Sequence, residues 1–422
     1  MRGNLIFYAI LLLLLIIVFN YLVYKELPHK EETQILNSVL QDVSIVKEID
    51  MGTGNFDDLN FLEEVLANKK IILLGEELHT DSETLKAKAR LIRFLHERLG
   101  YNVILYESGL YDSWTMNNEM NINPVEYSSK ALGGIGLFSY WWNNMESETL
   151  LDYYVQSKQT TNPINIGGFD IQFSGVNLNP EKRLGLLKDF LWKKNINFNK
   201  YPTLKTNILQ LIKIASGGYF KMTSEEQKKS LNELLLLSEE IQRLKFSTDT
   251  FIYSIYIKNF HDNLYKIFNY KTGSLTSMDF RDSLMANNLF NLIDNEYKDD
   301  KIIIWCANIH AFGKRYSEKY KPFGTYIKER YGTASYHIAF ASYATLNNDK
   351  NIVNRKGKNS LESLLNLINE PYLFINLRKV ESKSYLGGKF YLSANQGIKE
   401  KRKWKDIFDG IFFIKINKQS TF

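Results

Sequence analysis

Residues 71–109 read IILLGEELHTDSETLKAKARLIRFLHERLGYNVILYESG, and their pattern decides the fold. A short apolar run at 71–74 has the length of a buried strand, and a glycine follows it. Apolar residues then recur at helical spacing from Ser82 to Leu99. A second apolar run, Val103 to Tyr106, predicts another strand. This strand–helix–strand order predicts two parallel strands that lie side by side, joined by a right-handed crossover.

Acidic and histidine side chains follow both predicted strands. Glu76 and His79 come just after the first strand, and Glu107 comes at the end of the second. Because parallel strands finish at the same edge of a sheet, and ligands bind at that edge in open α/β sheets, we expect these side chains to share one cleft. An imidazole beside a carboxylate can take a proton from water near neutral pH. The alternative is that each glutamate is a helix cap or a surface charge.

The rest of the chain extends this unit into one large α/β domain over residues 46–422, with a mostly parallel sheet and flanking helices. Residues 180–271 differ, because several helical stretches follow one another there with few strand signals, and they predict a helical insertion. Further strands are predicted at 164–172, 301–305, 337–342, 372–378 and 407–416.

The amino-terminal segment predicts a membrane anchor. Residues 5–24 contain no charged side chain, and about 20 apolar residues span a bilayer as a helix. A cleaved secretory signal is the competing interpretation, but no small-residue cleavage site follows the run. We therefore expect a transmembrane signal anchor over residues 1–24 and a polar tether over 25–45. The catalytic domain would then lie on the outer, periplasmic or extracellular side of the cell membrane.

Composition excludes several classes of function. The net charge of +6 is spread along the chain, with no basic stripe or nucleic-acid motif. The single cysteine, Cys306, excludes an intrachain disulfide and a cysteine zinc site. The chain has no Gly-x-Ser-x-Gly elbow, Walker loop, dinucleotide fingerprint or His-Glu-x-x-His motif. Serine hydrolase, nucleotide and zincin chemistry therefore have no support.

Four further residues are candidates for the same cleft. His310 follows the strand at 301–305 in the way that His79 follows the first strand. Arg281 can clamp a carboxylate or an oxyanion, or can form a surface ion pair with Asp282 or another neighbour. Asp170 ends the strand candidate at 164–172. Trp141 lies in a segment rich in glycine and aromatic residues, which is either a packed loop or a wall of a substrate pocket.

In order and spacing, several motifs resemble the erythromycin esterase family over most of the chain from about residue 45 onward. The resemblance rests on Gly75-Glu76-x-x-His79, Tyr106-Glu107-Ser108, Gly168-Phe169-Asp170-Ile171-Gln172, Phe280-Arg281-Asp282-x-x-Met285-Ala286, Trp305-x-x-Asn308-x-His310, Gly324-Thr325-Tyr326 and Phe408-Asp409-Gly410-Ile411-Phe412-Phe413. It implies an α/β core with a helical insertion, and a metal-independent or weakly metal-linked hydrolase, with no cofactor predicted, that opens a macrolide lactone. His79 would be the general base, Glu76 and Glu107 would orient it, and Arg281 and His310 would bind and polarise the ester.

Two positions depart from the family pattern. Where the family has Trp-Ala-His-Asn-x-His, this chain has Ala307 at the place of the first histidine. Where the family has an arginine in the first helix, this chain has Lys88, which keeps the charge but loses the bidentate fork. Lys88 remains a candidate for substrate binding.

The sequence therefore favours a membrane-anchored hydrolase of an ester or lactone, with macrolide antibiotics, and so antibiotic resistance, among the possibilities. Its predicted partners are that small-molecule substrate and the lipid bilayer, without nucleic acid. One alternative is a metal- or haem-binding protein on the same scaffold, since Glu76, His79, Glu107 and His310 are potential ligands. The other is a catalytically inactive envelope protein whose cleft binds a ligand, which Ala307 favours.

Overall fold

The computed structural model describes residues 30–122 and 128–421, and within them a nine-stranded sheet forms the centre of the molecule. The strand order is β1-β8-β11-β6-β2-β5-β3-β4, with β7 paired to β6. The run from β11 to β4 is parallel, whereas β1, β7 and β8 pair antiparallel with their neighbours. The strands are β1 (Val43–Val46), β2 (Ile71–Leu74), β3 (Val103–Gly109), β4 (Asn165–Asp170), β5 (Ile302–Trp305), β6 (Ser335–Leu346), β7 (Ile352–Arg355), β8 (Tyr372–Asn376) and β11 (Gly410–Lys418).

The predicted strand–helix–strand unit is present, but its two strands are not neighbours. β2 and α4 (Ser82–Leu99) have the predicted bounds, and β3 runs on to Gly109. β5 lies between β2 and β3, and its Trp305 pairs with Leu74 on one side and Tyr106 on the other. The crossover fixes the direction of the two strands but leaves room for a third, so the predicted side-by-side pairing was wrong.

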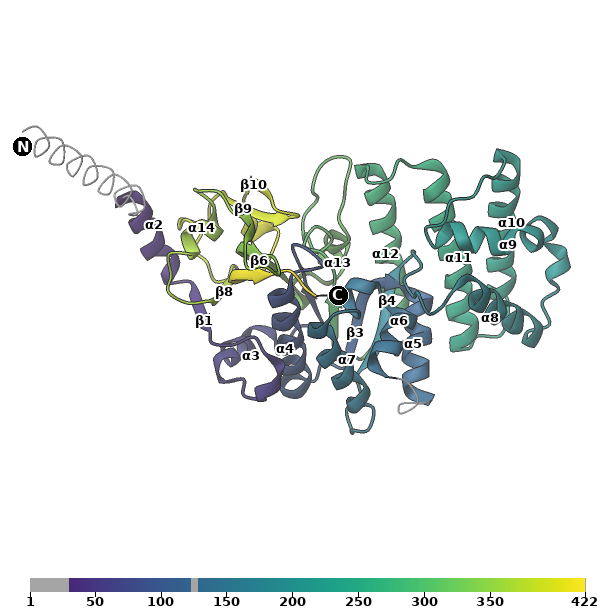
Figure 1. Cartoon of the computed structure of the whole chain (residues 1–422), viewed down its shortest axis with the longest axis horizontal. Helices are drawn as coiled ribbons and strands as arrows, with labels where there is room; N and C mark the ends of the chain where they lie inside the picture. The colour runs from purple at the N-terminus through teal and green to yellow at the C-terminus, as the bar shows by residue number, and fades with distance from the viewer. Residues whose placement is uncertain (1–29, 123–127, 422) are drawn as a thin grey trace, which may run out of the picture.

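Side chains of alternate strand residues build two cores, one on each face of the sheet. Ile72 and Leu74 pack with Leu91 and Leu95 of α4 in one core. Ile71 and Leu73 pack in the other core with residues of α12 (Leu275–Asn295). Because successive strand residues point to opposite faces, a fully apolar strand serves both cores. Helices therefore cover both faces of the sheet, as Figure 1 shows.

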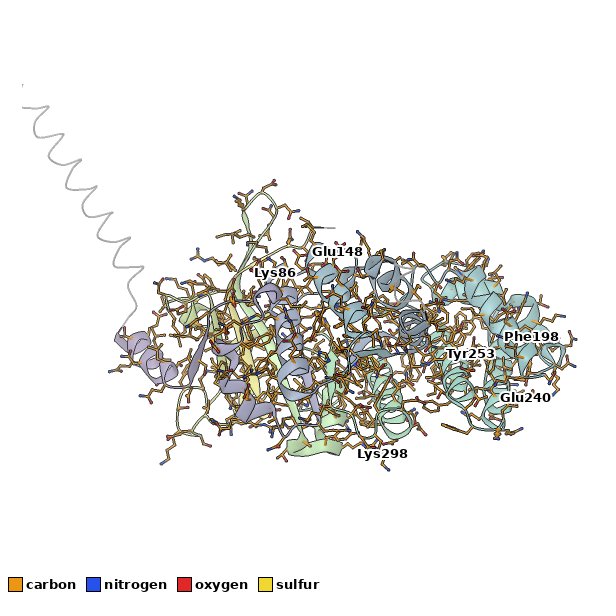
Figure 2. All side chains as sticks on the ribbon, turned by 90° about the horizontal axis from the view of Figure 1, so that it is seen from below. Lys86, Glu148, Phe198, Glu240, Tyr253 and Lys298 are labelled. Carbon is orange, nitrogen blue, oxygen red and sulfur yellow. The ribbon has the colours of Figure 1, made fainter. Side chains whose placement is uncertain are left out.

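The remaining helices divide between the sheet and a separate bundle. Those around the sheet include α2 (Lys30–Leu40), α3 (Phe61–Leu66), α5 (Leu110–Ile122), α6 (Ser129–Gly136), α7 (Met145–Ser157), α13 (Phe323–Tyr331) and α14 (Leu361–Leu365). The predicted helical insertion is occupied by α8 (Pro180–Lys193), α9 (Pro202–Ala215), α10 (Ser224–Gln242) and α11 (Thr248–Asn269). These four helices have a core of their own, in which Tyr253 stacks on Phe190 at 3.7 Å between ring centroids. Figure 1 shows this bundle at the end of the molecule opposite α2, and Figure 2 labels Tyr253 within it.

The amino-terminal predictions require correction. From Lys30 onward the predicted tether is structured, because α2 forms there and β1 pairs antiparallel with β8. Residues 5–24, where a transmembrane helix was predicted, lie outside the described residues. Within the described ranges, no helix has the length and apolar character needed to cross a bilayer. The fold class is therefore corrected to a mixed α/β fold with a central sheet and flanking helices, and placement as a single-pass membrane protein is not supported.

Candidate functional site

Glu76 lies at the centre of a buried cage of hydrogen-bond donors, just beyond the end of β2. Its Oε1 atom lies 2.6 Å from His79 Nδ1 and accepts a hydrogen bond from Trp141 Nε1 at 2.9 Å. Its Oε2 atom accepts from Lys88 Nζ and Trp305 Nε1, both at 2.7 Å. Burial alone would raise the pKa of this carboxyl, but Lys88 and His79 outweigh it and hold the pKa below its usual range. Glu76 is therefore an ionised carboxylate with all its lone pairs in use.

His79 is held so that one ring nitrogen stays open. Since the ionised Glu76 is an acceptor, Nδ1 carries a proton, and the neutral ring presents Nε2 as an acceptor. Nε2 has no hydrogen-bond partner among the residues that the structure describes. The ring stacks on Tyr140 at 4.4 Å and meets Trp141 edge-on at 5.4 Å, while its side chain is 33% exposed. This arrangement fixes the tautomer of the ring and leaves one ring nitrogen able to accept a proton.

Glu107 forms the second charged centre, at the end of β3. Its Oε1 atom accepts from Arg281 Nη2 at 2.8 Å and lies 3.2 Å from His310 Nε2, and its Oε2 atom accepts from the Ala307 amide at 3.0 Å. Burial would raise the pKa of Glu107, but His310, Arg281, His79 and the Ala307 amide lower it to about 2. Glu107 is therefore an ionised carboxylate held by Arg281, His310 and a backbone amide.

His310 is held from behind by Asp282. The His310 Nδ1 atom lies 2.8 Å from Asp282 Oδ2, and the same oxygen accepts from the Tyr320 hydroxyl at 2.8 Å and the Phe323 amide at 2.9 Å. Burial lowers the pKa of the imidazole, but the Asp282 and Glu107 carboxylates raise it above its ordinary value. His310 is therefore favoured as a cation, unlike a ring poised to accept a proton.

Arg281 connects Glu107 to the end of β4. Its Nε atom donates to Asp170 Oδ1 at 3.0 Å, and its Nη2 atom donates to Asp170 Oδ2 at 2.5 Å. Its third nitrogen, Nη1, lies 3.3 Å from His310 Nε2. When His310 is protonated both atoms are donors, so this contact marks a place where an acceptor oxygen would be favourable.

A small cavity lies beside Glu76 and His79. Its volume is about 50 Å³, enough for a water molecule. Its lining comes from the loop after β2, the loop after β5 and the turn between β9 (Phe390–Asn395) and β10 (Ile398–Arg402), and consists of Glu76, Glu77, Leu78, His79, Ala307, Ile309, Ala394, Asn395 and Gln396. Of the predicted residues, Glu76 and His79 line this cavity, and Ala307, which also lines it, donates its amide to Glu107.

The loops after β2 and β5 are fixed to each other by Asn308. The Asn308 amide donates to the Glu76 carbonyl at 2.8 Å, and its side chain pairs with both the amide and the carbonyl of Phe340 in β6. A Cβ atom on Gly75 would overlap the Asn308 side chain. Glycine at 75 therefore lets the loops approach closely enough to hold Glu76 in place.

The structure brings all eight predicted site residues into these two centres, although not all are open to a substrate. Lys88, Asp170 and Trp141 are buried and engaged by Glu76 or Arg281, so their contact with substrate stays a prediction. Sequence reasoning missed Trp305 and Tyr320. Asp282 was considered only as a surface ion-pair partner of Arg281. In the structure Asp282 contacts His310 Nδ1, whereas Arg281 contacts His310 Nε2. In the part of the chain that the structure describes, no three His, Cys, Asp or Glu side chains are grouped to hold a metal ion.

Comparison with known proteins agrees with this architecture. The family model described as erythromycin esterase matches residues 96–415. The Bacillus subtilis protein named "Putative hydrolase YbfO" is 25% identical over 370 residues, which cover 79% of this chain and 80% of that protein. The Escherichia coli "Erythromycin esterase type II" is 20% identical over 291 residues, or 64% of this chain and 67% of that protein.

Two solved structures share the fold. A Bacillus cereus protein superposes with a TM-score of 0.74 at 19% identity, covering 92% of this chain and 98% of its own. A mutant of the erythromycin esterase EreC, in its open conformation, superposes with a TM-score of 0.70 at 17% identity, covering 90% and 98%. Because the family model spans most of the sequence, this chain belongs to the erythromycin esterase family.

Proposed function

We propose that this protein hydrolyses an ester or lactone with water activated by His79. The observation that carries the proposal is the pair formed by His79 Nδ1 and the buried, ionised Glu76 at 2.6 Å, which leaves Nε2 as a free acceptor. A carboxylate behind an imidazole fixes its tautomer and increases its basicity. The cavity beside the ring, about 50 Å³ in volume, has room for the attacking water.

The reaction then proceeds in two balanced steps. The water oxygen bonds to the ester carbonyl carbon while His79 Nε2 takes the water proton, and the carbonyl oxygen becomes an oxyanion. Arg281 Nη1 and His310 Nε2, which lie 3.3 Å apart, are donors suited to that oxyanion. When the tetrahedral intermediate collapses, the bond to the alkoxy oxygen breaks and the leaving alcohol takes the proton from His79.

The size of the cavity constrains how a large substrate binds. Pockets that enclose drug-sized ligands have volumes of about 300–1,000 Å³, whereas this cavity has about 50 Å³. A macrolide is a candidate substrate because the family and two of the compared proteins carry the name erythromycin esterase. Its ring would lie outside the cavity, with only the ester group reaching His79.

The test is His79→Ala in the full chain. We expect hydrolysis to fall by about 10²–10⁴-fold, because one positioned base contributes that much, with an unchanged circular dichroism spectrum. Erythromycin and a panel of simple esters serve as substrates, and products are followed by mass spectrometry. His261→Ala, on α11 in the helical bundle, is the matched control. A folded His79→Ala protein with full activity would reject the mechanism.

A second candidate is a ligand-binding protein without turnover, and Ala307 favours it. Ala307 lines the same cavity as His79, and the family pattern has a histidine at its position. If the missing ring is essential, wild type would bind esters without cleaving them, and Ala307→His would gain hydrolysis. Turnover of any ester by wild type at a rate abolished by His79→Ala would dismiss this candidate.

A further inference from the structure

A larger cavity lies beside β4. It has a volume of about 260 Å³ and lies between β4, α5, α11 and the end of α12. β4 is the last strand in the sheet order, so this cavity follows the unpaired edge of the sheet. It shares no lining residue with the cavity beside His79. The chemistry of its walls is therefore independent of the proposed hydrolysis.

One wall presents amide donors whose orientation is fixed. The Asn117 Oδ1 atom accepts from the Ile166 amide at 3.0 Å and from Lys158 Nζ at 3.1 Å. Lys158 Nζ also donates to Asn165 Oδ1 at 3.4 Å. Because both oxygens are taken by donors, the NH₂ groups of the two asparagines are the ends left for other partners. Asn117 is only 8% exposed, yet its NH₂ group has no protein acceptor in residues 30–122 or 128–421.

Two other lining residues present acceptors. Asp300 Oδ1 accepts from Asn102 Nδ2 at 2.9 Å, which leaves the other oxygen of this carboxylate for a ligand. Glu296 also lines the cavity, and burial raises the pKa of its carboxyl although Thr248 acts to lower it. A hydrogen-bond donor on a ligand would offset the free-energy cost of burying the Glu296 carboxylate.

Two aromatic side chains, Trp114 and Tyr297, also line the cavity. The Tyr297 hydroxyl makes no hydrogen bond to any residue in the described part of the chain, so it can donate to or accept from a ligand. The volume lies just below the range of about 300–1,000 Å³ for drug-sized ligands. The cavity therefore suits a compact molecule with both polar groups and apolar faces.

We propose that this cavity binds a small, neutral, polyhydroxylated molecule of monosaccharide size. Each hydroxyl both donates and accepts, so one ring of hydroxyls can satisfy the asparagine donors and the carboxylate acceptors together. The C–H faces of such a ring fit against the indole and phenol rings. An anion would be repelled by Glu296 and Asp300, which line the cavity. Lys158, which donates to both asparagine oxygens, offsets part of the attraction of these carboxylates for a cation. A neutral polyol uses the donors and the acceptors without depending on either charge.

The test measures binding to the full chain by saturation-transfer NMR. The probes are glucose, galactose, mannose and inositol, with acetate and propylamine as the anionic and cationic alternatives. We expect saturable binding of at least one polyol, weakened at least tenfold in Glu296→Ala and in Tyr297→Phe. The matched control is Glu148→Ala, which removes an exposed glutamate on α7, visible at the surface in Figure 2.

Each outcome decides the proposal. Binding of acetate or propylamine in preference to every polyol would overturn the ligand class. Polyol binding that is equally tight in Glu296→Ala and Tyr297→Phe would overturn the location, and absence of saturable polyol binding would overturn the proposal as a whole. Ester hydrolysis should be unchanged in both variants, which shows that they fold and keeps this result separate from failure of the hydrolytic proposal.

Discussion

The low pKa of Glu107 makes acid stability a direct test of the charged site. The Glu107 side chain is buried against Arg281, His310 and the Ala307 amide. Burial raises the pKa of the carboxyl, but these groups and His79 lower it from 4.5 to about 2. At 1.36 kcal/mol for each pKa unit, the difference between the unfolded and folded pKa values of Glu107 corresponds to about 3 kcal/mol of folding free energy at neutral pH.

The sign of the pH dependence follows from which state binds the proton first. As pH falls, the unfolded chain protonates Glu107 near 4.5, whereas the folded protein does so only near 2. The stabilisation is therefore complete above pH 4.5 and is lost as pH falls from there toward 2. Glu107→Gln removes this titration. We expect the free energy of unfolding to fall more steeply for wild type than for Glu107→Gln across that window.

The assay is urea denaturation at a series of pH values, followed by circular dichroism. Other buried carboxylates also titrate, so the informative quantity is the difference between wild type and Glu107→Gln at each pH. Glu148→Gln, which removes an exposed carboxylate from α7, should follow the wild-type curve. Parallel pH dependence for wild type and Glu107→Gln would show that the carboxylate is not held as an anion by its neighbours.

Three further substitutions test other parts of the structure. In Asp282→Asn, burial still lowers the pKa of His310 but the charge that raised it is gone, so we expect the alkaline limb of kcat/KM to move to lower pH, which a pH–rate profile measures. Asp112→Asn breaks the buried pair with Arg183 and should cost about 3–5 kcal/mol in a denaturant titration. Gly75→Ala places a methyl group against an asparagine side chain and should cost about 1–3 kcal/mol, seen as a lower melting temperature.

Most of the sheet could be predicted because its strands are short, continuous apolar runs. β2 and β5 are buried on both faces, which the sequence expresses as IILL and IIIW. The position of β5 between β2 and β3 could not be predicted, because strand order depends on which faces pack together and not on the local pattern. Pairing in the sheet is set by residues more than 200 positions apart.

The candidate site also contains some residues that could be predicted from the sequence and others that could not. Residues that follow strands, such as Glu76 and Glu107, could be found because parallel strands end at one edge. The partners that tune them come from strand and helix interiors, where spacing carries no sign of chemistry. Trp305 has the pattern of an ordinary buried strand residue, yet its indole donates to Glu76. Lys88 lies on a helix with other basic residues; the family resemblance singled it out, but its burial against Glu76 could be seen only in the structure.

The place of β5 in the sheet also has a consequence for biosynthesis. A ribosome produces β2, α4 and β3 early, but the strand that must separate them is made only after the whole helical bundle has emerged. Until then, two apolar strands with matching edges are free to pair with each other in a wrong register. β5 can therefore insert between β2 and β3 only if these two strands have stayed apart or separate again. Trp305 reaches Glu76 only after that insertion.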